Sequence, residues 1–95
     1  MSLKIDFIKK EEKQKKKKMA EDFFKKVFYY DYTLFMKDSD GIPSFFTYGY
    51  IDDDGKEFLW QSSMASYNYE DFEEVIVRNC DKYIINEEEK FIVVW

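Results

Sequence analysis

Carboxylate side chains gather in clusters after the first third of the chain. The 15 acidic residues beyond position 30 concentrate at Asp38 and Asp40; at Asp52, Asp53 and Asp54; at Glu70, Asp71, Glu73 and Glu74; and at Glu87, Glu88 and Glu89. A surface of fixed carboxylates imitates a phosphate track, and it fits the Lys- and Arg-lined groove of an enzyme that handles nucleic acid. The alternative is a charged surface that keeps a chain rich in aromatic residues in solution.

Acidic and tyrosine side chains near the middle of the chain are the candidate contacts for a protein partner. Tyr and Trp are enriched at the centres of protein interfaces. The predicted partner-binding residues are Asp52, Asp53, Asp54, Glu70, Asp71, Glu73, Glu74, Tyr48 and Tyr50. We expect the partner to be a protein, for example a nucleic-acid-handling enzyme with a basic groove.

Lysines dominate the beginning of the chain. Residues 1–30 hold ten lysines and five acids, a net charge of +5, whereas residues 31–95 carry −10. Residues 9–18 contain no hydrophobic side chain and are predicted to be a Lys-rich solvated segment that leads into the first helix. The alternative binding site is a nucleic-acid site at Lys15, Lys16, Lys17 and Lys18. Lysines neutralise phosphates without reading sequence, but the total charge of −5 makes nucleic acid the less favoured partner.

The scarcity of His and Cys excludes several classes of catalytic and metal site. It contains no His and one Cys, which excludes Ser-His-Asp and Cys-His catalysis, His-ligated metals and an intrachain disulfide. Cys80 is predicted to be a buried structural thiol. The Asp52–Gly55 stretch fails as a calcium loop, because Tyr50 and Gln61 stand where acids are required. We therefore expect no enzyme activity, no metal and no cofactor; a small-ligand or nucleotide-binding module is a further alternative.

The hydrophobic pattern predicts the elements that position these residues. The alternating apolar residues of Leu3–Phe7 indicate a first strand. Apolar residues at helical spacing predict one helix over residues 11–29 and a second that begins after Ser66 or Asn68. The other predicted strands are residues 30–36, 44–51, 56–62, 83–85 and 90–95, with a turn at residues 38–43. The order β-α-β-β-β-α-β-β is an α+β fold with two helices and a mainly antiparallel sheet of five to six strands.

A hairpin around Asp53-Asp54-Gly55 is the clearest local pattern. A three-residue loop with Gly55 in the left-handed conformation avoids the like-charge pair that a shorter loop would create. The resulting register pairs Asp52 with Lys56, Tyr50 with Phe58, and Tyr48 with Trp60. The face predicted to form the core carries Phe46, Tyr48, Tyr50, Phe58 and Trp60.

Aromatic residues make up 21% of the chain, more than one covered sheet face and two helices can bury. Residues 91–95 are apolar at every position, so both faces of this strand need cover. Phe35-Met36 and Phe45-Phe46 likewise place large side chains on opposite faces. A homodimer, a closely curved sheet or a target protein would supply the cover.

Length and composition indicate a single α+β domain over residues 1–95. The N-terminus lacks a secretion pattern, and the longest apolar run is residues 91–95, against the roughly 20 residues that span a bilayer. One Cys fits a reducing compartment. We expect a cytoplasmic protein with no membrane contact.

In size, acidity and a helix–three-strand–helix middle, the chain resembles the small acidic inhibitors encoded by phages and mobile elements, including some anti-CRISPR proteins. The resemblance rests on these general features and on no motif, so no functional residue is carried over. It implies an anti-defence inhibitor that mimics nucleic acid. The leading hypothesis is a small acidic intracellular protein that inhibits or modulates a partner by occupying its surface.

Overall fold

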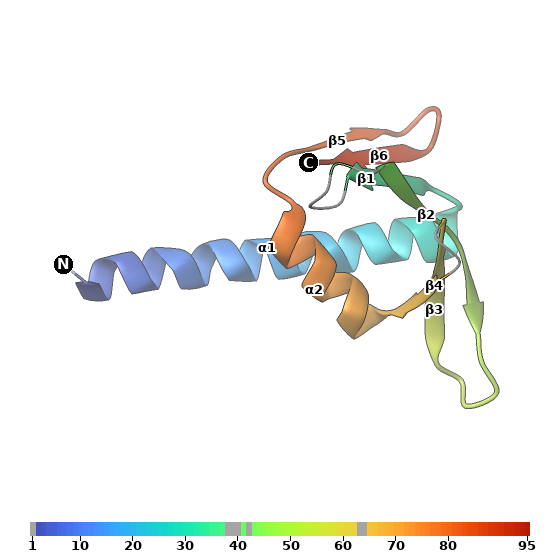
Figure 1. Cartoon of the computed structure of the whole chain (residues 1–95), viewed down its shortest axis with the longest axis horizontal. Helices are drawn as coiled ribbons and strands as arrows, with labels where there is room; N and C mark the ends of the chain where they lie inside the picture. The colour runs from blue at the N-terminus through green and yellow to red at the C-terminus, as the bar shows by residue number, and fades with distance from the viewer. Residues whose placement is uncertain (1, 38–40, 42, 63–64) are drawn as a thin grey trace.

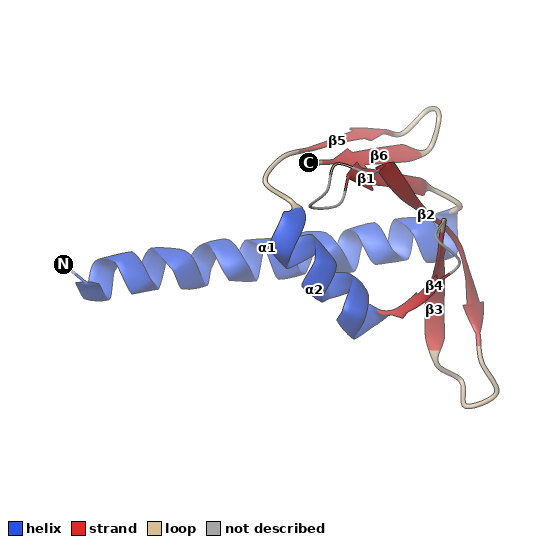
Figure 2. Cartoon of the chain, viewed as in Figure 1, coloured by secondary structure: helices blue, strands red, loops and turns tan. Residues whose placement is uncertain are grey.

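In the part of the chain that the structure describes, two helices pack on one six-stranded sheet (Figures 1 and 2). The computed structural model describes residues 2–37, 41, 43–62 and 65–95, with the backbone alone for residues 2–11. The predicted α+β class and mainly antiparallel sheet are confirmed. In chain order the elements are α1 (Ser2–Tyr30), β1 (Thr33–Lys37), β2 (Pro43–Ile51), β3 (Glu57–Gln61), β4 (Ala65–Asn68), α2 (Tyr69–Asn79), β5 (Tyr83–Asn86) and β6 (Phe91–Val94).

The strands follow the order β4-β3-β2-β1-β6-β5 across the sheet. Neighbouring strands run antiparallel except β1 and β6, which are parallel. The last strand in the sequence therefore lies inside the sheet, between β1 and β5. Leu34 of β1 pairs with Phe46 of β2 on one side and with Ile92 of β6 on the other.

Helix α1 begins at Ser2, so the strand predicted at Leu3–Phe7 is wrong. Residues 2–30 contain neither Gly nor Pro and are rich in Lys and Glu, which are good helix formers. A helix propagates through such a sequence more readily than three alternating apolar residues form a strand. The first half of α1 extends beyond the rest of the molecule (Figure 1). The predicted solvated segment at residues 9–18 is thus helical, and its described side chains are exposed except the half-buried Lys16.

Strand β4 is an element that the sequence pattern did not predict. Its four residues pair with β3 and lead directly into α2. The second of the two predicted helix starts is confirmed, because Asn68 caps α2 and its side chain accepts a 2.8 Å hydrogen bond from the backbone N–H of Asp71. The predicted turn at residues 38–43, with the Asp38 and Asp40 cluster, lies largely outside the described residues.

The β2–β3 hairpin has the predicted loop but only part of the predicted register. Gly55 has a φ of 80°, and Tyr50 pairs with Phe58 as expected. The backbone N–H of Asp52 donates to the Lys56 carbonyl at 2.9 Å, which confirms the end of the predicted register. Beyond Tyr50 the register shifts at a β-bulge between Thr47 and Gly49.

The bulge makes the predicted pair of Tyr48 with Trp60 wrong, since Thr47 lies opposite Trp60. It also reverses the predicted face, because a shift of one residue moves every side chain beyond it to the other side. Leu59 and Gln61 of β3 are buried under the helices. Tyr50, Phe58 and Trp60 were predicted to face the core, but their side chains lie on the sheet face away from the helices. Tyr48 is exposed at the bulge.

The core lies between the helices and one face of the sheet. Buried side chains come from both helices and from the strands: Ala20, Phe23, Phe24, Val27, Leu34, Met36, Phe46, Leu59, Phe72, Ile76, Cys80, Ile92 and Val94. Phe72 of α2 is fully buried and contacts two rings edge-on, Phe24 of α1 at 5.7 Å and Phe46 of β2 at 5.1 Å between centroids. Such aromatic pairs stabilise a core beyond the area they bury.

Gly49 lets the last turn of α1 approach the sheet. A Cβ at this position would lie 2.0 Å from Cδ2 of Phe28, closer than any two carbon atoms can pack. The Phe28 ring therefore occupies the space that a side chain on β2 would fill.

We expect Gly49→Ala to lower the free energy of unfolding by about 1–3 kcal/mol, because the ring of Phe28 must move to admit a methyl group. Urea denaturation measures the loss. In the double variant with Phe28→Leu, the two losses should be less than additive, since the smaller side chain relieves the clash. Strict additivity, or an unchanged Gly49→Ala variant, would contradict this packing.

Candidate functional site

Two of the predicted acidic clusters, at the β2–β3 hairpin loop and at the start of α2, flank one groove, and we call this region the acidic end. It comprises Asp52, Asp53, Asp54, Glu70, Asp71, Glu73 and Glu74. Tyr50, Phe58 and Asn68 lie opposite one another on β2, β3 and β4. The hairpin loop continues from β2, and α2 begins directly after Asn68. Because adjacent strands are about 4.8 Å apart, the bases of the two acidic segments are about 10 Å apart.

A groove of about 290 Å³ lies between these two segments. It is lined by Gly55, Lys56, Glu57, Asn68, Tyr69 and Glu70. On one side, the Asp52 carboxylate accepts hydrogen bonds from the backbone N–H of Asp54 at 2.9 Å and of Lys56 at 2.8 Å. Asp52 therefore holds the turn together, while Asp53 and Asp54 are exposed.

The α2 side of the acidic end combines exposed acids with acids held by neighbours. Glu70 and Asp71 are exposed in the first turn, where negative charge favours the helix dipole. Glu74 pairs with Arg78 at 2.9 Å. Glu73 accepts a hydrogen bond from Tyr69. The side chains most open to a partner are thus the two acids of the first turn and the two at the hairpin loop.

The two predicted tyrosine contacts are accessible. Tyr48 is 55% exposed at the bulge. Tyr50 is 38% exposed, stacks on Phe58 at 5.5 Å, and donates a 2.7 Å hydrogen bond from its hydroxyl to Ser66 Oγ. These contacts hold the Tyr50 ring in one orientation beside the acidic end.

The predicted lysine site is divided around α1 and does not form one basic face. Lys15, Lys17 and Lys18 are exposed, but consecutive residues point to different sides of a helix. Lys17 lines a groove of about 540 Å³ between α1 and α2. Its other lining residues are Lys13, Glu70, Glu73, Glu74, Val77 and Arg78. Part of the basic segment therefore lies beside the acidic residues of α2.

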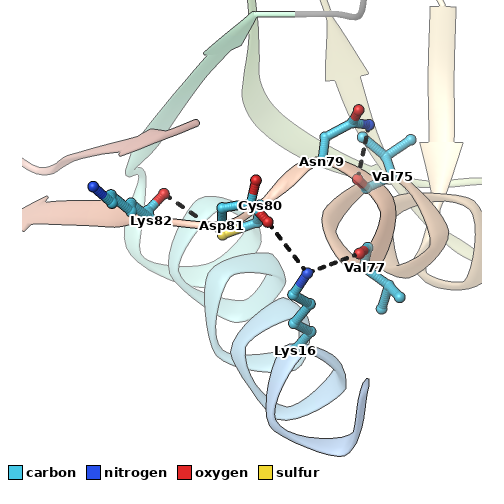
Figure 3. A network of polar contacts seen from close by, with 7 residues as sticks. All are labelled: Lys16, Val75, Val77, Asn79, Cys80, Asp81 and Lys82. Atoms are coloured by element: carbon cyan, nitrogen blue, oxygen red, sulfur yellow. Dashed lines mark hydrogen bonds and ion pairs between the residues drawn. The ribbon is translucent and has the colours of Figure 1, made fainter. Parts of the chain in front are cut away.

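Lys16 fastens α1 to the C-terminal end of α2 (Figure 3). Its Nζ atom lies 3.5 Å from the carbonyl oxygen of Val77, to which it donates, and 3.6 Å from Oδ1 of Asp81. A cation at this end of a helix interacts favourably with the helix dipole. Lys16 thus has a structural contact that its place in a lysine run did not indicate.

Cys80 is buried, as predicted, and forms the C-cap of α2. Its Sγ atom lies 3.7 Å from the carbonyl oxygen of Lys82 (Figure 3). Burial raises the pKa of the thiol; nearby Lys16 acts in the opposite direction and Asp81 in the same direction. A thiol kept protonated in this way is a poor nucleophile.

Tyr29 of α1 and Tyr69 of α2 lie against carboxylates and are functional-site candidates that the acidic and lysine clusters did not indicate. The hydroxyl of Tyr29 hydrogen-bonds to Glu57, and this bond is the main cause that raises the pKa of Tyr29. Burial, followed by the hydrogen bond to Glu73 and the charges of Glu73 and Glu21, raises the pKa of Tyr69 to about 12. The contact of Tyr29 with Glu57 joins α1 to β3, so only the tertiary structure reveals it, whereas Tyr69 and Glu73 lie four residues apart on α2.

Comparisons of the chain with protein-family models, curated proteins and solved structures found no match. Among the described residues, neither helix has a stretch long and apolar enough to cross a membrane. The fold and its surfaces therefore supply the basis for a functional proposal.

We expect Lys16→Gln to lower the free energy of unfolding by about 0.5–1 kcal/mol, because α2 loses a cation at its C-terminal end. The control is Lys18→Gln, which removes the same charge from an exposed position of α1. Urea denaturation compares the two variants. Equal stability of the two variants would show that the Lys16 contact contributes nothing.

Tyr69 should lose its proton near pH 12, above the ordinary tyrosine value of 10. Because the pKa of Tyr69 is higher in the folded state than in the unfolded state, protonated Tyr69 contributes to the stability of the fold. This contribution is complete below pH 10 and is lost as the pH rises to about 12. Glu73→Gln should lower this pKa while burial keeps it above 10. Spectrophotometric titration of tyrosinate measures the shift, and Glu74→Gln on the same helix is the control. An identical titration in Glu73→Gln would contradict the contact.

Proposed function

We propose that this protein is a small acidic binding protein that inhibits or modulates a partner protein by occupying its surface. The supporting observation is the acidic end, where pairing of β2, β3 and β4 places the bases of two acidic segments about 10 Å apart. The carboxylates of this region that are most open to a partner, those of Asp53, Asp54, Glu70 and Asp71, complement a groove lined by Lys and Arg. Such a groove is the usual phosphate-binding surface of proteins that handle nucleic acid.

The rigidity of the acidic end also supports the proposal. The Asp52 carboxylate fixes the hairpin loop, the Asn68 cap fixes the start of α2, and the hydroxyl of Tyr50 is bonded to β4. A preorganised surface loses less conformational entropy when it binds. The resemblance to phage and mobile-element inhibitors in size and acidity supports an anti-defence role as the sharper form of the proposal.

Nucleic acid itself has less support as the partner. Lys16 is engaged by the end of α2, and Lys17 lines a groove with three glutamates. The lysine segment therefore offers phosphates a divided basic surface. Direct binding of DNA or RNA, weakening steeply with salt, is the result expected from this alternative.

An oligo-arginine peptide serves as the probe for a basic groove. We expect isothermal titration calorimetry to show binding to the wild-type chain. The test variant neutralises the exposed acids Asp53→Asn, Asp54→Asn and Glu70→Gln. Three solvent-exposed charge pairs contribute about 1–2 kcal/mol together, so binding should weaken about 5- to 30-fold.

The matched control is the triple variant Glu87→Gln, Glu88→Gln and Glu89→Gln at the β5–β6 turn. It changes the net charge by the same amount at residues that are equally exposed. Its peptide affinity should change less than about twofold, since these acids lie outside the acidic end. Equal weakening in the two triple variants would mean that the acidic end has no special role.

The natural partner is sought by capture from nuclease-treated lysate. A protein that the wild-type chain retains, that duplex DNA displaces, and that the Asp53, Asp54 and Glu70 variant fails to retain would be the partner expected here. A retained protein that duplex DNA leaves bound would contradict nucleic-acid mimicry.

A further inference from the structure

The sheet face opposite both helices, which we call the outer face, is uncovered within the described part of the chain (Figure 1). Its central strands carry large exposed rings. Phe35 of β1 is 42% exposed and Phe45 of β2 is 40% exposed, although both strands are paired on each side. Residues at the middle of a sheet keep this exposure only where nothing packs on the face.

Apolar side chains form a continuous row across four strands of the outer face. Ile84 of β5 lies opposite Val93 of β6, Val93 opposite Phe35 of β1, and Phe35 opposite Phe45 of β2. The Phe35 ring contacts the rings of Phe45 at 6.0 Å and Phe91 at 6.3 Å. Side chains alternate along β6, and Ile92 and Val94 are buried under the helices. The apolar side chains of residues 91–95 that still need a covering surface therefore lie on the outer face alone.

The outer face is almost without charge. Among the outward positions of the six described strands, Lys37 is the one charged side chain, in a chain with 37% charged residues. The other charged strand residue, Glu57, lies on the helix side, where it accepts a hydrogen bond from Tyr29 of α1. Two identical copies of this face can therefore meet without facing like charges across the contact.

We propose that the outer face binds the outer face of a second copy of this chain, in a two-fold symmetric dimer with the two sheets packed face to face. An interface of this kind uses one self-complementary patch on each subunit. Two sheets pack in this way about 10 Å apart, with their inner side chains interdigitated. The Phe35 row lies at the centre of the contact, and each acidic end stays at the periphery.

The size of the face fits a dimer interface. Six strands at about 4.8 Å spacing and about 3.3 Å per residue give a flat area of roughly 400 Å² on each copy. The relief of the aromatic side chains raises the accessible area buried by two copies to roughly 1,000 Å², where specific interfaces begin. Interfaces at this lower limit of size belong to weak, reversible complexes, and we expect a Kd of about 1–100 µM.

Salt distinguishes this dimer from the other self-contact that the charges allow. The basic segment of α1 could meet the acidic end of a second copy, and salt would dissociate such a pair. In the proposed dimer the contact is apolar and each copy carries −5, so salt screens the repulsion between the copies. Dimerisation should therefore strengthen as the salt concentration rises.

Sedimentation equilibrium of the wild-type chain tests the proposal. At about 200 µM and about 0.5 M salt, above the expected Kd, we expect an average mass well above 11.7 kDa that rises toward twice this value with concentration. A mass of 11.7 kDa under these conditions would overturn the proposal. So would a dimer that dissociates as the salt concentration rises.

Phe35→Lys places like charges at the centre of the contact and should raise the dimer Kd at least about tenfold. The matched control is Tyr30→Lys, since Tyr30 is 62% exposed at the end of α1, away from the outer face. Ile84→Lys, at a 54% exposed edge position, is the second variant if Phe35→Lys fails to fold. Equal dimerisation of the outer-face variant and the control would place the contact elsewhere and overturn the proposal.

Separate measurements test the proposed dimer and the proposed binding function, so either proposal can be overturned without the other. Neutralising the acidic end should leave the wild-type dimer Kd unchanged or lower, because those acids lie outside the contact and add to the repulsion. Phe35→Lys should leave oligo-arginine binding per chain unchanged. A monomer that still binds the peptide would overturn the dimer alone.

Discussion

Three aromatic rings hold both helices on one face of the sheet. Phe72 of α2 is inserted between Phe24 of α1 and Phe46 of β2 and is fully buried there. Because α1 and α2 meet at this ring, neither helix is available to cover the opposite face. The same contact fixes α2 beside the sheet, so its acidic first turn stays next to the β2–β3 hairpin. The positions of the two surfaces with proposed roles, one charged and one apolar, thus both depend on the packing of Phe72 between Phe24 and Phe46.

The elements that the sequence predicted best carry strong local signals. Asn68 precedes a helical pattern with acids in its first turn, and the helix begins there. The prediction of a three-residue hairpin loop was correct because Gly55 identifies the position with a left-handed backbone conformation. The strand predicted at Leu3–Phe7 was wrong because a short alternation of apolar and polar residues competes poorly with a long run of good helix formers. Strand β4 has a weak pattern of its own and exists because β3 offers it backbone hydrogen-bond partners, which is a tertiary effect.

The candidate site was predictable in composition but not in arrangement. The acidic clusters are visible in the sequence, yet their proximity depends on β4, which no pattern indicated. The bulge at Thr47–Gly49 reversed the expected faces of the hairpin, so Tyr50, Phe58 and Trp60 lie away from the core. Gly49 was the local sign of this irregularity, since Gly inside a strand often accompanies a bulge or a close backbone approach. The contact that engages Lys16 joins two helices distant in sequence, and a lysine run alone cannot distinguish a bound lysine from a solvated one.

The position of β6 inside the sheet has a consequence for how the chain folds. β1 pairs with β6 in parallel, so two segments from opposite halves of the chain must meet before the sheet is continuous. Until they do, the earlier strands present the β1 edge with its backbone groups unpaired and apolar side chains beside it. Contacts between residues far apart in sequence make folding slow, because loop closure costs entropy before the contact forms. The pairing of β6 with β1 therefore removes an edge at which this aromatic-rich chain is open to edge-to-edge aggregation while it folds.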